Sequence, residues 1–163
     1  MSTVLQLAIS RGGLPKLPIL EAEVTPLGLA GDVQKNRKYH GGPLQALLLL
    51  TAEGLEELQA AGYPVYPGAL GENITTRGLD RRLLRLGQRY RLGEVEIELT
   101  KMRQPCRALA PFGDSIRKAV YDADVQAGRP TSPRWGLAGF YAKVLEPGRL
   151  YPGDPITLLP DPC

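Results

Sequence analysis

Glycine and proline recur so often in this sequence that they limit every regular element to a short length. The chain has 19 glycines and 15 prolines among 163 residues, well above the share found in ordinary globular proteins. Hydrophobic residues still make up 43% of the chain, which is enough for a buried core. This combination predicts many short elements joined by tight turns. It argues against a helix bundle, a coiled coil and a disordered chain.

The length and the apolar pattern bound the domain organisation. We expect one domain spanning residues 1–163, with its core at about residues 4–159. The longest apolar run, residues 46–50, is far shorter than the roughly 18 residues of a membrane span. The first residues do not resemble a signal peptide. A cytoplasmic protein without a membrane partner is therefore expected.

Alternation of residue types predicts a mainly β fold. In residues 95–100, apolar residues alternate with glutamates, which is typical of a strand with one buried and one solvated face. Residues 46–50 are apolar throughout, as in a strand buried on both faces. Helices are expected at residues 52–61, capped by Thr51, and at 114–127. Further short strands are expected at residues 4–9, 19–24, 74–76, 88–92, 137–145 and 156–159, with 74–76 paired to 88–92. The pattern favours a closed or nearly closed β-barrel with a few inserted helices.

The charge balance and the cysteine count exclude several classes of protein. Twenty basic and 17 acidic residues give a net charge of +3, too mild an excess to indicate a nucleic-acid partner. An anionic small molecule explains local Arg and Lys equally well. Cys106 and Cys163 are too few for a disulfide framework or a four-ligand zinc site, and Cys163 is expected to be an exposed tail thiol. Phosphate-loop and Rossmann motifs are absent.

The segment around Cys106 is the first candidate for chemistry. Lys101, Arg103 and Arg107 lie within five residues of this cysteine, just past a predicted strand. Neighbouring positive charge favours the thiolate, which is the reactive form of a cysteine. Loops at strand ends are also where functional groups are commonly presented. A buried structural cysteine is an equally good interpretation of the spacing alone.

The loop that contains His40 is the second candidate. His40 is the only histidine, and Gly41 and Gly42 follow it, so backbone N–H groups could approach an anion closely. Asp32 precedes them in the same loop. The simpler interpretation is that Asp32 caps a turn and His40 bonds to the backbone. A Cys–His hydrolase is not favoured, because the sequence identifies no carboxylate partner for His40.

The third candidate is the segment from Gly71 to Asn73. Gly68 and Gly71 lie just before Glu72 and Asn73, which indicates a polar pair in a constrained loop. The alternative is an Asx-type turn that opens a strand. A metal site built wholly from this chain is not expected, since one histidine and one well-placed cysteine leave too few ligands.

Taken together and in this order, the segments resemble the MOSC domain, the module at the C-terminus of molybdenum cofactor sulfurases. The resemblance spans most of the chain, from about residue 4 to residue 158. Its matching stretches are Gly28-Leu29-Ala30-Gly31-Asp32-Val33-Gln34, His40-Gly41-Gly42-Pro43, Leu70-Gly71-Glu72-Asn73, Arg103-Gln104-Pro105-Cys106, Gly139-Phe140-Tyr141-Ala142-Lys143-Val144 and Gly153-Asp154. Within the family, the chain is similar to the small stand-alone bacterial type.

The resemblance implies a β-barrel-rich fold of the pyruvate-kinase-barrel type and a central cysteine, which corresponds to Cys106. Family members bind molybdenum cofactor, carry sulfur as a cysteine persulfide, or do both. In amidoxime-reducing relatives the matching cysteine ligates molybdenum, and those proteins reduce N-hydroxylated bases. A bacterial branch is linked to resistance against N-hydroxylated purines. That branch implies a lysine and an asparagine near the cysteine, which Lys16 and Asn73 match.

The chain also departs from the larger relatives. It has no aminotransferase-like domain with a pyridoxal lysine, so pyridoxal phosphate is only a family-level association. It contains no flavin domain and no cysteine set for an iron–sulfur cluster. Any reduction would therefore need an external reductase, and any sulfur transfer an external donor. A non-catalytic sulfur carrier or binding module is the alternative to an enzyme.

These arguments give a set of expected site residues. We expect Cys106 to be the molybdenum ligand, persulfide carrier or nucleophile, with Asn73, Lys16 and His40 as further catalytic residues. His40 and Asp32 would hold the loop or move a proton. The expected cofactor-binding residues are Asp32, Gly41, Gly42, Gly71, Glu72, Asn73, Lys101, Arg103 and Arg107.

Overall fold

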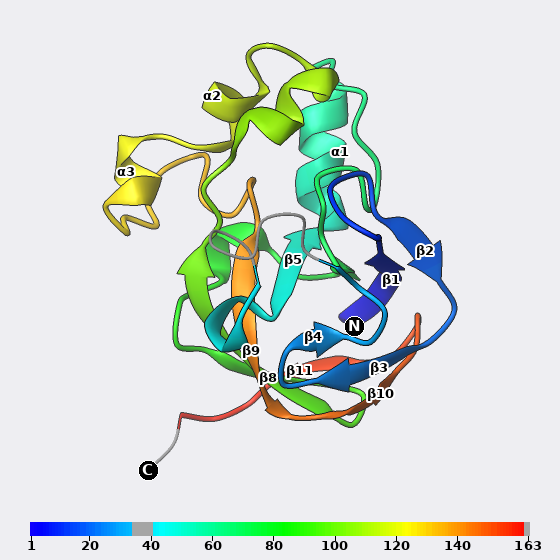
Figure 1. Cartoon of the computed structure of the whole chain (residues 1–163). Helices are drawn as coiled ribbons and strands as arrows, with labels where there is room; N and C mark the ends of the chain where they lie inside the picture. The colour runs from blue at the N-terminus through cyan, green and yellow to red at the C-terminus, as the bar shows by residue number, and fades with distance from the viewer. Residues whose placement is uncertain (34–40, 162–163) are drawn as a thin grey trace.

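The computed structural model describes residues 1–33 and 41–161, which form two β-sheets with helices gathered at one end (Figure 1). The larger sheet has eight strands in the order β11-β7-β8-β9-β5-β6-β1-β2, and the smaller has the order β10-β3-β4. The strands are β1 (Thr3–Ile9), β2 (Leu17–Ile19), β3 (Ala22–Thr25), β4 (Gly28–Leu29), β5 (Leu47–Thr51), β6 (Ile74–Arg77), β7 (Arg89–Leu92), β8 (Val95–Met102), β9 (Phe140–Glu146), β10 (Gly148–Leu150) and β11 (Ile156–Leu158). The helices are α1 (Ala52–Ala60), α2 (Ile116–Val120) and α3 (Ala123–Gln126), with 3-10 turns at Pro43–Gln45, Arg81–Leu83 and Arg107–Phe112.

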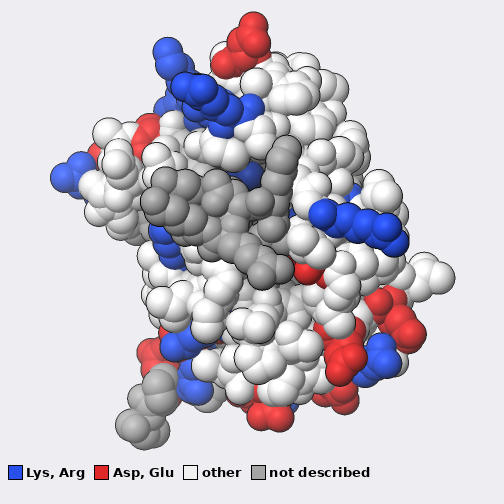
Figure 2. All heavy atoms as spheres, viewed as in Figure 1, with Lys and Arg blue, Asp and Glu red and all other residues white. Residues whose placement is uncertain are grey.

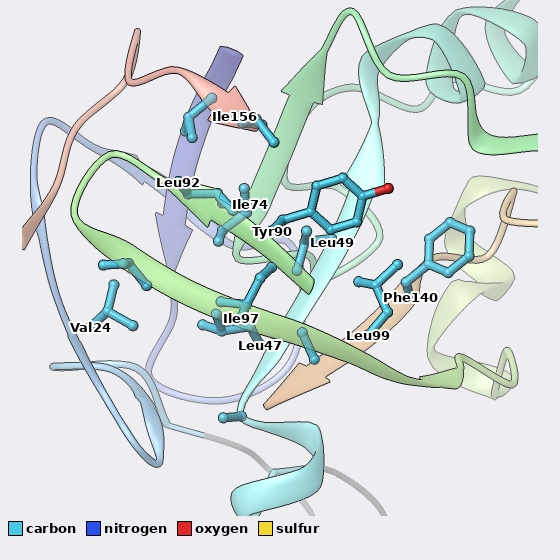
Figure 3. Packing of buried hydrophobic residues seen from close by; sticks show 14 of the residues in the cluster. Val24, Leu47, Leu49, Ile74, Tyr90, Leu92, Ile97, Leu99, Phe140 and Ile156 are labelled. Atoms are coloured by element: carbon cyan, nitrogen blue, oxygen red, sulfur yellow. The ribbon is translucent and has the colours of Figure 1, made fainter. Parts of the chain in front are cut away.

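Strand β5 separates two hydrophobic clusters because its side chains alternate between the faces of the sheet. Leu47 and Leu49 pack into the main core between the sheets, together with residues of β1, β3, β7 and β8 (Figure 3). Leu48 and Leu50 pack on the other side against α1, α2 and the loops beside them. All five residues of β5 are buried, which confirms the predicted two-sided burial. The alternation predicted for residues 95–100 is also confirmed in β8.

Strand β6 has different neighbours from those predicted. It pairs with β1 in antiparallel fashion and with β5 in parallel fashion, whereas β7 pairs with β8 and β11. The pairing of residues 74–76 with 88–92 was therefore wrong. Parallel neighbours need a long crossover, usually a helix, and α1 with the loop after it supplies one. The side-chain oxygen of Thr51 caps α1 by accepting the Gly54 N–H at 3.0 Å, as the sequence predicted.

The fold is mostly β with a few helices, as predicted, but the expected closed barrel is not present. In the described part of the chain the edge strands β2 and β11 do not pair with each other, so the sheets are open. The chain just before β11 approaches β1 at an isolated bridge between Thr3 and Pro155. There the Val4 N–H donates to the Asp154 carbonyl and the Ile156 N–H donates to the Ser2 carbonyl, both at 2.9 Å.

Three element boundaries also differ from the prediction. Residues 19–24 do not form one strand, because the chain turns at the exposed Leu20 and passes from β2 in one sheet to β3 in the other. Residues 114–127 form two short helices, since Tyr121 is extended and the Asp122 side chain starts α3 by accepting the Val125 N–H at 2.8 Å. Strand β10 was not predicted.

No helix in residues 1–33 or 41–161 is both long and apolar enough to cross a membrane.

Candidate functional site

Six separated stretches of the described chain meet around a cavity of about 820 Å³. Its size lies within the range of pockets that hold small ligands and cofactors. The residues that line the cavity are Gly13, Leu14, Lys16, Asp32, Val33, Gly41, Gln45, Leu48, Gly71, Asn73, Lys101, Arg103, Gln104, Pro105, Cys106, Arg107, Ala108 and Tyr141. The structure therefore brings together most of the residues predicted from the three sequence segments.

The Cys106 segment forms one wall because β8 ends at Met102 and the chain then turns across the cavity. Cys106 is half-buried and lies immediately before the 3-10 turn at Arg107–Phe112. Lys101 and Arg107 are exposed at the rim, and the Lys101 Nζ lies 3.4 Å from the Gln45 Oε1. The predicted cluster of cations around this thiol is thus present at the cavity.

Arg103 differs from the other two cations because it is buried, with 2% of the residue exposed. Its guanidinium donates to the carbonyl oxygens of Leu70 at 2.9 Å and Ala138 at 3.1 Å. Its Nε is also buried and makes no hydrogen bond with the described residues. A buried cation is costly unless its charge is balanced and its donors are bonded. Arg103 therefore has unused capacity to bind an anion in the cavity.

Lys16, Asp32 and Asn73 form a buried polar cluster on another wall. The Lys16 ammonium lies 2.6 and 2.7 Å from the two carboxylate oxygens of Asp32. Asp32 also accepts hydrogen bonds from the Asn73 Nδ2 at 2.8 Å and from the Ser10 N–H at 2.9 Å. The Asp32 side chain is only 1% exposed and that of Lys16 10%. Asp32 therefore holds the lysine and the asparagine in one fixed arrangement.

The side-chain amide of Asn73 forms hydrogen bonds to other residues of the protein. Besides donating to Asp32, its Nδ2 donates to the Ala8 carbonyl at 3.3 Å, and its Oδ1 accepts the Leu48 N–H at 3.1 Å. Asn73 thus ties the ends of β1 and β5 together at the start of β6. Both amide donors of Asn73 are therefore committed to partners within the protein.

Glu72 points away from the cavity surface, although its two neighbours in the chain line it. The residue is 0% exposed and is not among the lining residues. Burial raises the pKa of its carboxyl to about 7, while nearby backbone N–H groups and the positive charge of Arg103 oppose this rise in part. Thr75 donates to its Oε2 at 3.4 Å, and its Oε1 is buried without a hydrogen bond to the described residues.

The remaining predicted residues have different positions. Gly41 and Gly71 line the cavity, whereas Gly42 is exposed and does not line it. His40 and Cys163 lie outside the described residues. Burial raises the pKa of Tyr141, which lines the cavity near Arg103 and Cys106. The sequence reasoning missed this tyrosine, and its position at the start of β9, opposite Lys101 in the sheet register, is the signal that could have found it.

The cavity has the charge expected of a site for an anion. Four basic side chains line it, while Asp32 is its one carboxylate among the described residues and is paired with Lys16. On the face in Figure 2, Lys and Arg lie around the upper and middle parts and also among the Asp and Glu side chains near the lower edge, and a further acidic group lies at the top. The described residues contain no group of three or more His, Cys, Asp or Glu side chains that could hold a metal ion. A metal bound here would need most of its ligands from another molecule.

The chain is a small β-rich domain with a basic cavity that a cysteine lines, and comparison with known proteins identifies its family. The MOSC domain family matches residues 36–157. The chain belongs to the MOSC domain family, as its motifs predicted.

Curated relatives support this assignment. The chain is 35% identical over 133 residues to the uncharacterized protein YflK of Bacillus subtilis, covering 79% of this chain and 54% of the relative. It is 31% identical over 144 residues to protein YiiM of Escherichia coli, covering 85% and 59% of the two chains. The chain thus spans little more than half the length of these two relatives. A protein named "Reductase" from Gibberella moniliformis is 27% identical over 143 residues, covering 83% of this chain and 23% of that protein.

A solved structure shows the same fold. The crystal structure of YiiM from Geobacillus stearothermophilus matches with a TM-score of 0.72 at 24% identity. The match covers 98% of this chain and 76% of that chain. At this level of identity the similarity establishes the fold alone.

Proposed function

We propose that this chain binds an anionic, pterin-type molybdenum cofactor in the cavity, with the Cys106 thiolate as the protein's ligand to the metal. The observation that carries the proposal is the placement of a free cysteine and four basic side chains around one cavity of about 820 Å³. Membership of the MOSC domain family supports it. A reducing compartment such as the cytoplasm would keep Cys106 available as a thiol.

The residues present fit such a cofactor. Molybdenum in this cofactor is already held by the sulfur atoms of the pterin, so one protein thiol is enough to complete a site that lacks a cluster of side-chain ligands. The buried and unbonded Nε of Arg103 offers a donor to an anionic group. When bound, the cofactor would supply two-electron chemistry at the metal.

The protein's own side chains would attract the anion, bind it and donate a proton. Lys101 and Arg107, exposed at the rim, attract an anion from solution, because charges at a cleft raise the local concentration of counter-ions. Arg103 offers its guanidinium to the bound anion from a buried position. Lys16 is held by Asp32 and offers a proton donor at the opposite wall. Gly41 and Gly71 allow the backbone to approach the ligand.

Metal and pterin analysis tests the proposal on protein expressed in a host that makes molybdenum cofactor. We expect the wild-type protein to retain both molybdenum and pterin after purification. The Cys106→Ser variant should lose most of the molybdenum, because the serine hydroxyl is a much poorer ligand than a thiolate. Cys163→Ser is the matched control and should retain the wild-type content.

Other outcomes separate the alternatives. A wild-type protein with neither molybdenum nor pterin would contradict the proposal. A mass increase of one sulfur atom on Cys106, without molybdenum, would identify a persulfide carrier instead. Equal molybdenum in the wild-type and Cys106→Ser proteins would show that this cysteine is not the ligand.

Reduction of N-hydroxylated bases is the second candidate function, and the relative named "Reductase" favours it. This chain covers 23% of that relative, which leaves room there for other domains that could carry electrons. The reaction converts an N-hydroxyl group to N–H and water, and consumes two electrons and two protons. The electrons would come from a separate reductase protein. The loaded protein, given a chemical reductant, should convert an N-hydroxylated purine, and loss of this conversion in Cys106→Ser would support it.

A further inference from the structure

Arg103 carries a buried positive charge that can be balanced from two directions. Among the described residues its guanidinium donates to the carbonyl oxygens of Leu70 and Ala138 and not to a carboxylate, and its Nε is unbonded. Arg103 lines the cavity. The charge of Arg103 also acts on the buried carboxyl of Glu72, without an ion pair between these two described side chains.

Glu72 and Arg103 are also connected through the backbone. The loop that carries Glu72 includes Leu70, whose carbonyl accepts the 2.9 Å hydrogen bond from Arg103. The Glu72 Oε1 and the Arg103 Nε are both buried without hydrogen bonds to the described residues. A buried carboxyl oxygen and a buried guanidinium nitrogen without hydrogen bonds, linked through the Leu70 carbonyl, indicate two groups whose charges respond to what fills the cavity that Arg103 lines.

We propose that Glu72 is a proton-linked positioning residue, which competes with the cavity's anionic ligand for the charge of Arg103 and takes up a proton when that ligand binds. This inference rests on the proposed function, because it requires an anion in the cavity. Glu72 itself does not contact the ligand and acts through Arg103. The role differs from the direct cofactor contact that the sequence predicted for Glu72.

The direction of the pH dependence follows from the pKa of Glu72. With an empty cavity its pKa is about 7, so the carboxyl is largely protonated below pH 7 and ionised above it. An anion beside Arg103 adds a like charge and raises the pKa of Glu72 further. Binding therefore takes up a proton above pH 7, and the affinity for the anion falls as the pH rises. Below pH 7 the carboxyl is protonated in both states and the affinity no longer changes through this group.

The groups that face Glu72 come from two other parts of the fold. Arg103, directly after β8, supplies the positive charge, and Thr75 in β6 supplies a hydroxyl donor. The backbone N–H groups of Gly68 and Leu70 belong to its own loop. Cys106 and Tyr141 also line the cavity, so their titration has to be controlled.

Calorimetric titration with inorganic sulfate, which does not itself titrate near neutral pH, tests this linkage. In the wild-type protein we expect the affinity for sulfate to fall by up to about tenfold per pH unit above pH 7, with matching proton uptake. Glu72→Gln, a neutral variant of the same shape, should bind sulfate with little pH dependence and no proton uptake. Glu146→Gln, which changes an exposed glutamate in β9, should behave like wild type. The difference in proton uptake between wild type and Glu72→Gln separates Glu72 from the other groups that line the cavity.

A second measurement keeps the inference testable if a variant fails to fold. The carbon-13 resonance of the Glu72 carboxyl in the wild-type protein should titrate near pH 7, and its midpoint should rise when sulfate is added. The midpoint should also rise in Arg103→Gln. A midpoint that moves with neither change, or equal pH dependence in wild type and Glu72→Gln, would overturn the inference. Absence of sulfate binding at every pH would instead contradict the anion site of the proposed function, and the Arg103→Gln titration would still decide the link between the two side chains.

Discussion

At the scale of single residues, Asp32 has the largest number of polar contacts at the site. Its buried carboxylate accepts bonds from the Lys16 ammonium, the Asn73 amide and the Ser10 N–H. These partners come from the segments around β1, β2 and β6, so Asp32 joins three parts of the chain. Because the ion pair is buried, removal of one partner leaves the other as an uncompensated charge.

The Asp32→Asn substitution should therefore destabilise the protein. We expect the free energy of unfolding, measured by denaturant titration, to fall by roughly 3 kcal/mol, the usual cost of breaking a buried ion pair. Lys16→Met is the matched change on the other partner. The double variant should be more stable than the sum of the two single effects predicts. Strict additivity would show that the two side chains do not depend on each other.

Part of this residue-level arrangement could be predicted from the sequence. Lys101, Arg103, Cys106 and Arg107 lie within seven positions, so local spacing alone places their charges near the thiol. Lys16 and Asn73 are 57 positions apart, and both reach Asp32 because β1 pairs with β2 on one side and with β6 on the other. Spacing could not predict this shared partner, and only the resemblance to the family placed the two residues at one site. The burial of Glu72 beneath the cavity depends on the same strand pairing and was not predicted.

At the scale of the elements, Gly68 sets how closely the loop before β6 approaches the strand region at Lys16. The Gly68 carbonyl accepts the Lys16 N–H at 2.9 Å, and φ of Gly68 is +92°. A Cβ on Gly68 would lie 2.5 Å from the Lys16 carbonyl oxygen, which is closer than real Cβ contacts. The glycine therefore permits the approach that brings Lys16 and Asn73 to one cavity.

Gly68→Ala should lower the free energy of unfolding, and Gly87→Ala is its matched control. Both positions have φ near +90°, but a Cβ on Gly87 would meet nothing within 4 Å. The backbone strain of about 1–3 kcal/mol is therefore common to both variants. The additional loss in Gly68→Ala measures the steric contact with Lys16. Equal losses in thermal or denaturant unfolding would contradict the close approach.

The elements themselves were predicted best where the sequence pattern is strong. The continuous apolar run of β5, the alternation in β8 and the Thr51 cap of α1 all reflect local signals. Pairing partners depend on contacts between distant segments, which is why the partner assigned to β6 was wrong. The break at Tyr121 was missed because an Asp122 cap in mid-segment resembles an ordinary polar residue of a helix.

At the scale of the whole molecule, the cavity lies where strand ends of the open sheet and short loops come together. The ends of several strands leave a cavity at one side of the larger sheet, and the loops that glycine shapes converge there. The high content of glycine and proline predicted short elements correctly, but not the open edges at β2 and β11. Closure of the sheet depends on the pairing of its two edge strands, which local sequence patterns do not specify.

The central claim is that Cys106 is engaged by the ligand of this cavity, and the rate of its alkylation tests it most directly. Mass spectrometry can follow the reaction of Cys106 with iodoacetamide in cofactor-loaded and cofactor-free protein, with Cys163 as the internal reference. Only a free thiolate reacts, so we expect Cys106 to react at least about tenfold more slowly in the loaded protein, while the rate at Cys163 stays the same. Equal rates at Cys106 in the two preparations would contradict the account.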